Sequence, residues 1–173
     1  NPSANFMGPG CVKDLGHRCE LLNMKKPLIV TDDFLASVEN GPVAQSLASL
    51  KEKGIESVIF TGVEPNPKIE NCYEGLKVYQ ENGCDSIITI GGGSAHDCGK
   101  GIGIAATHEG YLADYAGIET LTNPLPPVIA VNTTAGTASE VTRHCVLTDR
   151  STKLKFVIMS WRNVPLVSFN DPM

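Results

Sequence analysis

The segment spanning residues 86–100 constrains the fold of this 173-residue chain more than any other part of the sequence. A run of mostly β-branched residues at 86–90 leads into three glycines at 91–93, and the residues that follow have helical spacing. This order predicts a strand, a tight loop and the N-terminus of a helix. Ser94 is the expected N-cap, and Asp97 would complete a capping box with it.

A junction of this kind suits a phosphate group. The first N–H groups of a helix lack partners, the positive end of the helix dipole lies behind them, and glycines let a diphosphate approach the backbone. The alternative is a plain connector, since the spacing is not the Gly-x-Gly-x-x-Gly fingerprint. Gly99, Gly101 and Gly103 favour the phosphate site. Each costs about 1 kcal/mol relative to alanine in a helix interior, which makes sense where the backbone packs closely on a sheet or a ligand.

Strands and helices are expected to alternate along the chain. The hydrophobic patterns predict strands at 27–32, 57–60, 87–90, 128–132 and 164–169, and helices at 11–22, 43–53 and 73–83. Two further runs, 145–148 and 155–158, flank a turn and predict a β-hairpin near the C-terminal end. Residues 5–10 are expected to be irregular. The alternation is typical of an α/β fold in which helices cover both faces of a parallel sheet.

Composition argues against several classes of function. The chain carries a formal net charge of −5, so no basic stripe is available to bind nucleic acid. No apolar run reaches the roughly 18 residues that span a bilayer, and no signal peptide is visible, so we expect a cytoplasmic protein without a membrane or nucleic-acid partner. Its six cysteines form no Cys-x-x-Cys pair, which favours reduced thiols over a disulfide framework or a zinc site.

A second polar loop follows the strand expected at 128–132. It contains Thr133, Thr134 and Thr137 beside one glycine. Because ligands of open parallel sheets bind beyond the carboxyl ends of the strands, this loop and the glycine loop should line one crevice. A hydroxyl-rich helix cap is the alternative role for these threonines.

Four motifs together resemble the iron-containing, or group III metal-dependent, alcohol dehydrogenases. They are VTD at 30–32, EPNP at 64–67, GGGSAHDCGKGI at 91–102 and NTTAGTASE at 132–140. Their order and distances match that family, and the resemblance covers essentially the whole chain. Segments 107–110, 141–148 and 160–163 most resemble the 1,3-propanediol dehydrogenase branch, followed by the NAD-dependent methanol dehydrogenases.

The resemblance implies a fold and an activity. Residues 1–173 would form a Rossmann-like NAD-binding domain of the dehydroquinate synthase-like superfamily. An all-helical C-terminal domain, missing from this chain, would hold a divalent metal, usually iron, through one aspartate and three histidines. The enzyme would interconvert a short-chain primary alcohol or diol, such as 1,3-propanediol, and its aldehyde, because the metal favours the alkoxide that delivers hydride to NAD.

Both ends of the chain look cut, and by itself it is expected to bind no metal, to carry no catalytic residue and to turn over no alcohol. His17, His96, His108 and His144 do not change this expectation, because no two of them have the i,i+4 spacing of a two-histidine clamp. The family also implies a homo-oligomer. Two other activities stay open: the chemistry of the glycerol dehydrogenase and dehydroquinate synthase relatives, and a stand-alone nucleotide-binding module without catalysis.

Cofactor contacts are implied residue by residue. The positions that match the family's site are Asp32, Asn66, Gly91, Gly92, Gly93, Ser94, Asp97, Lys100, Thr133, Thr134, Thr137 and Lys155. Asp32 would accept the hydroxyls of the adenosine ribose and repel a 2′-phosphate, so that NAD is preferred over NADP. Gly92, Gly93 and Ser94 would hold the pyrophosphate. The threonines would contact the riboses, and Lys155 would reach the nicotinamide ribose.

Several of these residues have simpler alternative roles. Asp32 could cap a turn, and Asn66 lies in a rigid Pro-Asn-Pro turn. Asp97 and Lys100 could form a solvated i,i+3 ion pair. Lys155 could be an exposed lysine of the hairpin, since strands place every second residue in solvent.

Overall fold

The computed structural model describes residues 4–172. Residues 1–3 and 173, and with them the expectation that both ends are cut, lie outside this description. The centre of the molecule is a six-stranded sheet in the order β1-β9-β6-β4-β2-β3, with parallel pairing throughout. Its strands are β1 (Ala4–Met7), β2 (Pro27–Val30), β3 (Val58–Phe60), β4 (Ser86–Gly91), β6 (Val128–Asn132) and β9 (Val167–Asn170). The predicted parallel sheet is confirmed.

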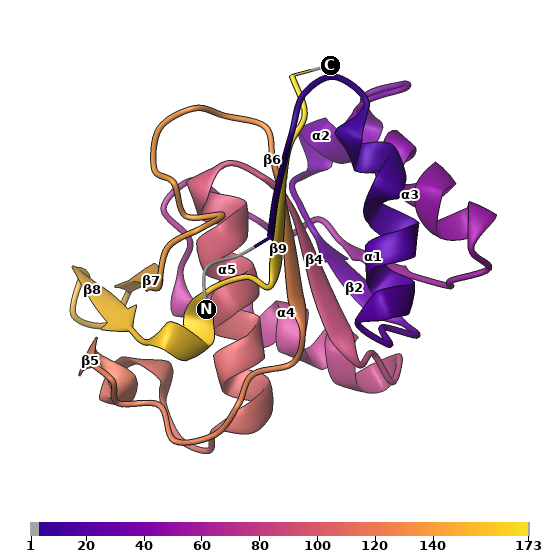
Figure 1. Cartoon of the computed structure of the whole chain (residues 1–173). Helices are drawn as coiled ribbons and strands as arrows, with labels where there is room; N and C mark the ends of the chain where they lie inside the picture. Colours follow the sequence, from indigo (N-terminus) through magenta and orange to yellow (C-terminus); the bar gives the residue numbers. More distant parts are fainter. Residues whose placement is uncertain (1–3, 173) are drawn as a thin grey trace.

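Helices cover both faces of this sheet (Figure 1). On one face lie α1 (Leu15–Leu21), α2 (Asp33–Ser37) and α3 (Pro42–Glu52), and on the other lie α4 (Ile69–Glu81) and α5 (Gly93–Thr107). Short 3-10 helices occupy Cys11–Asp14, Leu112–Tyr115 and Trp161–Asn163. The arrangement has three layers, as expected for strands joined by crossover helices.

A smaller sheet lies beyond α5 (Figure 1). Its strands, in spatial order, are β5 (Gly117–Ile118), β8 (Leu154–Met159) and β7 (His144–Asp149). β7 and β8 pair antiparallel along their whole length, so the predicted hairpin is confirmed. This sheet places the hairpin over the first half of α5, where the thiol of Cys145 donates to the carbonyl of Asp97.

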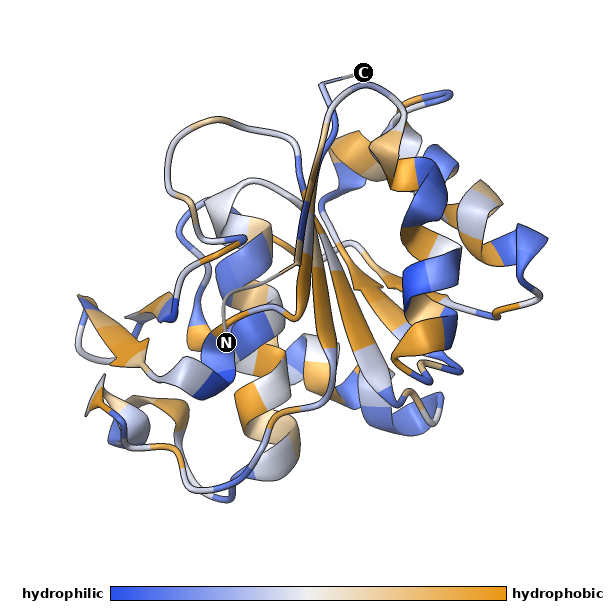
Figure 2. Ribbon diagram, in the orientation of Figure 1, coloured by the Kyte–Doolittle hydropathy of each residue, from blue (hydrophilic) through white to orange (hydrophobic). Residues whose placement is uncertain are grey.

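The side chains of the central strands alternate between two cores. In β4, Ile87 packs with residues of α4 and α5, whereas Ile88 and Ile90 pack with residues of α1 and α3. Figure 2 shows the central strands as hydrophobic and the outward faces of the helices as mixed or hydrophilic. A strand that is buried on both faces reads as a continuous apolar run, which is the pattern seen at 86–90.

Glycines bring α5 close to its neighbours. A Cβ at Gly99 would lie 2.1 Å from Cγ2 of Thr89 in β4. One at Gly101 would lie 2.5 Å from Sγ of Cys72 in α4, whereas one at Gly103 would meet nothing nearer than 3.5 Å. The glycines at 99 and 101 therefore mark close packing of the helix backbone, and the one at 103 does not.

The expectation of an irregular N-terminal segment is wrong for its first residues. Residues 4–7 form strand β1, which pairs parallel with β9 at the edge of the sheet. The ring of Phe6 stacks on that of Phe169, with the centroids 5.1 Å apart. An edge strand of four residues with largely exposed side chains gives little local pattern to predict it from.

The predicted capping box is also wrong. α5 begins at Gly93 with Gly92 as its N-cap, and no side chain caps it. Ser94 lies inside the first turn, and Asp97 accepts a hydrogen bond from a different loop. The N–H groups of Gly93 and Ser94 consequently have no side-chain cap, whereas those of Ala95 and His96 donate to the Gly92 carbonyl.

Two expectations from composition can be compared with the structure. Within residues 4–172, no helix is long and apolar enough to cross a membrane. All six cysteines are free thiols, as predicted, and five of them are buried. Burial raises the pKa of the Cys145 thiol well above its ordinary value, so this thiol stays protonated at neutral pH.

Alanine at Gly99 is expected to destabilise the protein by about 1–3 kcal/mol, because the added methyl group has no room against Thr89. Gly103→Ala is the matched control on the same helix, and it should stabilise the protein by about 0.5–1 kcal/mol through helix propensity alone. Urea unfolding followed by circular dichroism measures both. Effects of the same sign would contradict the close packing of α5 on β4.

Candidate functional site

Two loops leave the sheet side by side at the carboxyl ends of β4 and β6. Gly91 is in register with Asn132, and the Thr133 N–H donates to the Gly91 carbonyl over 3.0 Å. Gly91 has a φ of 148°, a conformation that side-chain-bearing residues rarely adopt. The expected crevice therefore has a defined centre, where the chain turns from β4 into α5.

The two loops touch at two glycines. A Cβ at Gly92 would lie 2.7 Å from Oγ1 of Thr134. A Cβ at Gly93 would lie 2.7 Å from Oγ1 of Thr137. Any larger residue at either position would push the threonine loop away from the start of α5.

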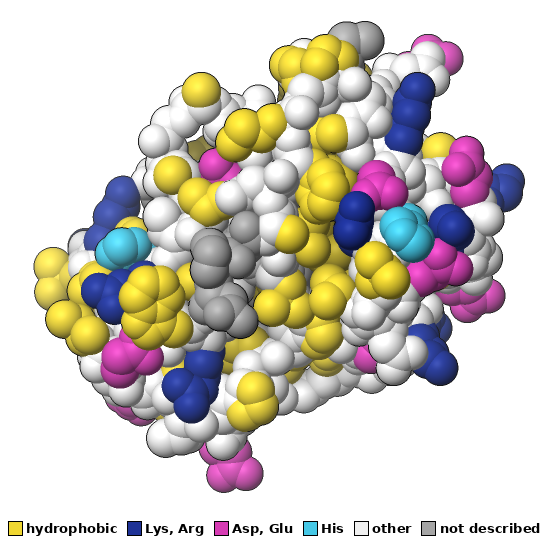
Figure 3. Space-filling model, viewed as in Figure 1, with side chains coloured by type: hydrophobic (Ala, Val, Ile, Leu, Met, Phe, Trp, Pro, Cys, Tyr) yellow, Lys and Arg dark blue, Asp and Glu magenta, His cyan; other side chains and the backbone are white. Residues whose placement is uncertain are grey.

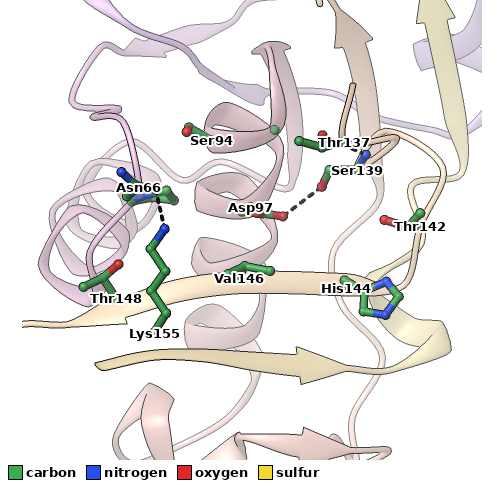
Figure 4. A pocket seen from close by; sticks show the side chains of 12 residues that line it. Asn66, Ser94, Asp97, Thr137, Ser139, Thr142, His144, Val146, Thr148 and Lys155 are labelled. Atoms are coloured by element: carbon green, nitrogen blue, oxygen red, sulfur yellow. Dashed lines mark hydrogen bonds between the residues drawn. The ribbon is translucent and has the colours of Figure 1, made fainter. Parts of the chain in front are cut away.

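Two cavities flank the first turn of α5, and Gly93 and Ser94 line both of them. The first, of about 360 Å³, extends to Asp32 and is called the Asp32 cavity. The second, of about 440 Å³, extends to Lys155 and is called the Lys155 cavity. Figure 4 shows the second cavity between α5, the threonine loop and the β7–β8 hairpin.

Asp32 combines two of its expected features. It is the N-cap of α2, where its Oδ1 accepts from the Leu35 N–H over 2.8 Å, so the capping role is present. The same side chain lies on the wall of the Asp32 cavity with Glu64 and Pro65. Its contact with a ribose stays a prediction.

Lys155 reaches the cavity from strand β8. Its Nζ donates to Oδ1 of Asn66 over 2.6 Å (Figure 4). Asn66 itself has a φ of 55°, so the turn that carries it is in the left-handed region. The hairpin thus brings together two predicted residues that lie 89 positions apart in the sequence.

Asp97 points toward the Lys155 cavity from the second turn of α5. Its Oδ1 accepts from the Ser139 hydroxyl over 2.8 Å (Figure 4). Burial raises the pKa of this carboxyl, while the Lys100 charge and the Ser139 hydrogen bond oppose the rise. Ser139, Thr142 and His144 also line this cavity, and none of the three was predicted to bind the cofactor.

Lys100 is not a solvated partner of Asp97. Its side chain is fully buried, with 0% exposure, and its ammonium group binds oxygen atoms of the 139–144 segment. Because it has no exposed surface, it lines neither cavity. The alternative of an exposed ion pair is therefore wrong.

Thr133 lines neither of these two cavities. It lines a third cavity, of about 430 Å³, with Glu140 and Asn170. Thr134 lines both this cavity and the Asp32 cavity. The structure thus places most of the predicted residues on the walls of the Asp32 and Lys155 cavities, whereas Gly91, Lys100 and Thr133 line neither cavity.

Comparison with known proteins identifies the family. The model of the iron-containing alcohol dehydrogenases matches residues 2–172. The chain belongs to the iron-containing alcohol dehydrogenases. The resemblance of the four sequence motifs is confirmed by this match.

Individual relatives in this family are similar along nearly the whole chain. The 1,3-propanediol dehydrogenase of Citrobacter freundii is 63% identical over 172 residues, covering 99% of this chain and 44% of that protein. The NAD-dependent methanol dehydrogenase of Bacillus methanolicus is 39% identical over 99% of this chain and 44% of its own length. A crystal structure of 1,3-propanediol oxidoreductase superposes with a TM-score of 0.95 at 64% identity, over 99% of this chain and 44% of that one. The chain therefore spans less than half the length of these relatives.

Among the residues that the structure describes, no three His, Cys, Asp or Glu side chains are grouped so as to hold a metal ion. His96 is a core residue, whose Nδ1 lies 2.7 Å from Oγ1 of Thr89 and whose Nε2 lies 3.4 Å from Oδ1 of Asn132. His108 is also buried, and its Nε2 accepts from the backbone N–H groups of residues 122 and 123.

His96 should make the stability of this iron-containing alcohol dehydrogenase chain depend on pH. Burial lowers the pKa of His96 from 6.5 to about 4, so the unfolded state binds the extra proton between these values. The free energy of unfolding should fall as pH falls through this window, by up to about 1.4 kcal/mol per pH unit. His96→Gln should lose this pH dependence of the free energy of unfolding, whereas His17→Gln, at an exposed position, should keep it. Urea titrations at several pH values give the free energy of unfolding as a function of pH. If this free energy changes with pH equally in all three proteins, the buried, neutral imidazole of His96 is contradicted.

Proposed function

We propose that this chain supplies the NAD-binding half of an enzyme that oxidises a short-chain primary alcohol or diol. One observation carries the proposal: two cavities meet at the N-terminus of α5, where Gly93 and Ser94 line both. A dinucleotide has the same layout, with two nucleosides joined by a diphosphate. The diphosphate would lie against the N–H groups of the first turn of α5, at the positive end of the helix dipole.

The two cavities differ in the groups they offer to the two nucleosides. The adenosine ribose would lie in the Asp32 cavity, where the carboxylate of Asp32 can accept its hydroxyls. The nicotinamide riboside would lie in the Lys155 cavity, beside Thr137, Asp97 and Lys155. Bound NAD supplies the acceptor for the hydride that leaves the alcohol carbon.

The family supports a metal-assisted reaction, but the described side chains do not provide a metal site. No chemical step is therefore assigned to a metal within this chain. We infer that the metal, with iron as the candidate, is held by the part of the relatives that this chain does not match. Under this proposal the chain alone binds nucleotide without turning over alcohol.

Sequence identity ranks the candidate substrates. Identity to the propanediol enzyme of Citrobacter freundii is 63%, against 39% to the methanol enzyme of Bacillus methanolicus. We therefore propose 1,3-propanediol and its aldehyde, 3-hydroxypropanal, as the first substrate pair to test. The higher sequence identity to the propanediol enzymes supports this choice.

We also propose a cytoplasmic, homo-oligomeric enzyme. Apolar side chains gather at the side of the molecule formed by the small sheet (Figure 3). Ile118, Leu154 and Trp161, on β5, β8 and the following 3-10 helix, are 64%, 65% and 65% exposed. Exposed apolar side chains of this size support burial against another chain.

The proposal predicts a preference between the two nucleotides. The chain should bind NAD, and NADP at least about tenfold more weakly, because a 2′-phosphate would face the Asp32 carboxylate. Asp32→Asn keeps the oxygen that caps α2 and removes the charge, so it should bring the affinities for NAD and NADP closer together. Asp33→Asn, the exposed neighbour in the same helix, is the control that should leave it unchanged. Isothermal titration calorimetry measures all affinities.

Two results would count against the proposal. A folded wild-type chain that binds neither nucleotide would overturn the assignment of the two cavities. Equal affinity for NAD and NADP would leave the cavities in place and overturn the role given to Asp32.

A further inference from the structure

The buried ammonium group of Lys100 joins two walls of the Lys155 cavity. One wall is the first two turns of α5, with Gly93, Ser94 and Asp97. Lys100 follows one turn later on that same helix. The facing wall is the 137–144 segment, which contributes four of the residues that line the cavity. Lys100 is therefore placed to set the separation of the two walls.

The contacts of Lys100 with the facing wall are short and numerous. Nζ donates to the carbonyl of Ser139 over 2.7 Å and to its hydroxyl over 3.0 Å. It also lies 3.0 Å from the carbonyl of Thr142 and 2.8 Å from that of His144. Three N–H donors are thus shared among four oxygen atoms from three residues.

Most of the segment that Lys100 binds lies outside the sheets. Residues 133–143 form neither helix nor strand, so a strand ladder does not pair their carbonyl groups. The carbonyl of Arg143 accepts from the Ser160 N–H and from the Asn163 side chain, whereas those of Ser139 and Thr142 accept from Lys100. No carboxylate lies within ion-pair distance of Lys100 among residues 4–172. A charge buried without a direct counter-ion is costly, and a methionine would fill the same space without that cost. The ammonium of Lys100 therefore stabilises the loop by donating hydrogen bonds to its carbonyl groups.

A relay connects Lys100 with the cavity itself. The Ser139 hydroxyl accepts from Nζ of Lys100 and donates to Oδ1 of Asp97 over 2.8 Å. Figure 4 shows this Asp97 carboxylate turned toward Ser139. The direction of an acidic group in the cavity therefore depends on the same ammonium.

We propose that Lys100 is a positioning residue, which ties the 137–144 loop to α5 and so keeps the Lys155 cavity formed before the nucleotide arrives. The proposal rests on the proposed function in one respect, because it takes NAD as the molecule that uses the cavity. A preformed site binds more tightly than one that must be ordered on binding. Lys100 thus acts on NAD through the loop and does not touch it.

Lys100→Met is the first test, made in the 173-residue chain without truncation. NADH should bind to the folded variant about tenfold or more weakly than to the wild type. Amide hydrogen exchange should accelerate in residues 137–144 and stay unchanged in β4. Lys100→Gln restores two donors without the charge, so its affinity should lie between those of the wild type and the methionine variant. Lys77→Met, on the exposed side of α4, is the matched control and should change neither readout.

The outcomes separate a positioning role from a merely structural one. A structural role would lower the melting temperature but leave the affinity of the folded variant for NADH unchanged, and that result would overturn the proposal. Unchanged exchange in the 137–144 loop would overturn it as well. If the wild type binds no NADH, the proposed function fails, and loop exchange still decides whether Lys100 holds the wall.

A measurement on the wild type covers the case in which the methionine variant does not fold. Acetylation by an amine-reactive reagent, read by mass spectrometry, should modify Lys77 quickly and Lys100 only after unfolding. Modification of Lys100 at the rate of Lys77 would show that the ammonium is not held by the loop and would overturn the proposal.

Discussion

Gly92 and Gly93 let the first turn of α5 touch the threonine loop, and the geometry of the candidate site follows from this contact. β4 and β6 are neighbouring parallel strands, so both loops leave the sheet at the same edge. A Cβ at either glycine would come within 2.7 Å of a threonine hydroxyl, so a larger residue would separate the loops. The close approach places bare N–H groups between two cavities and brings the 139–144 segment within reach of Lys100.

The charges of the site are local and differ from the charge of the whole chain. The chain has a formal net charge of −5, yet its candidate site suits an anion. The positive field comes from the N-terminus of α5 and from the buried ammonium of Lys100. The two carboxylates, Asp32 and Asp97, line the walls of the two cavities. A bound group responds mainly to the nearest dipoles and charges, whereas net charge governs approach from a distance.

Features with a local cause could be predicted from the sequence. The central strands, the main helices and the β7–β8 hairpin have periodic patterns and turn residues of their own, so their types and approximate positions were predicted. The pairing of β1 was not, because its partner β9 lies about 160 residues away. The N-cap of α5 was predicted as Ser94, but it is Gly92, two residues earlier, where a side chain would collide with Thr134 of the neighbouring loop.

The candidate site divides in the same way. The motifs that resemble the family marked Asp32, Ser94 and Lys155, which the structure places on the walls of the two cavities. Spacing alone suggested a surface ion pair for Lys100, because nothing local shows that the 139–144 segment folds over it. One sequence feature could have indicated Ser139 and Thr142 as site residues: both follow a strand end in a segment that is rich in hydroxyl groups. Their contacts depend on tertiary structure.

The central claim is that a diphosphate binds at the first turn of α5 between the two cavities. The most direct test is a titration of the isotopically labelled chain with NAD, followed by amide chemical shifts in nuclear magnetic resonance spectra. The account predicts that the largest shifts occur at Gly93, Ser94 and Ala95, and that inorganic pyrophosphate moves the same amides. Saturating NAD that shifts other amides and leaves these three in place would contradict it.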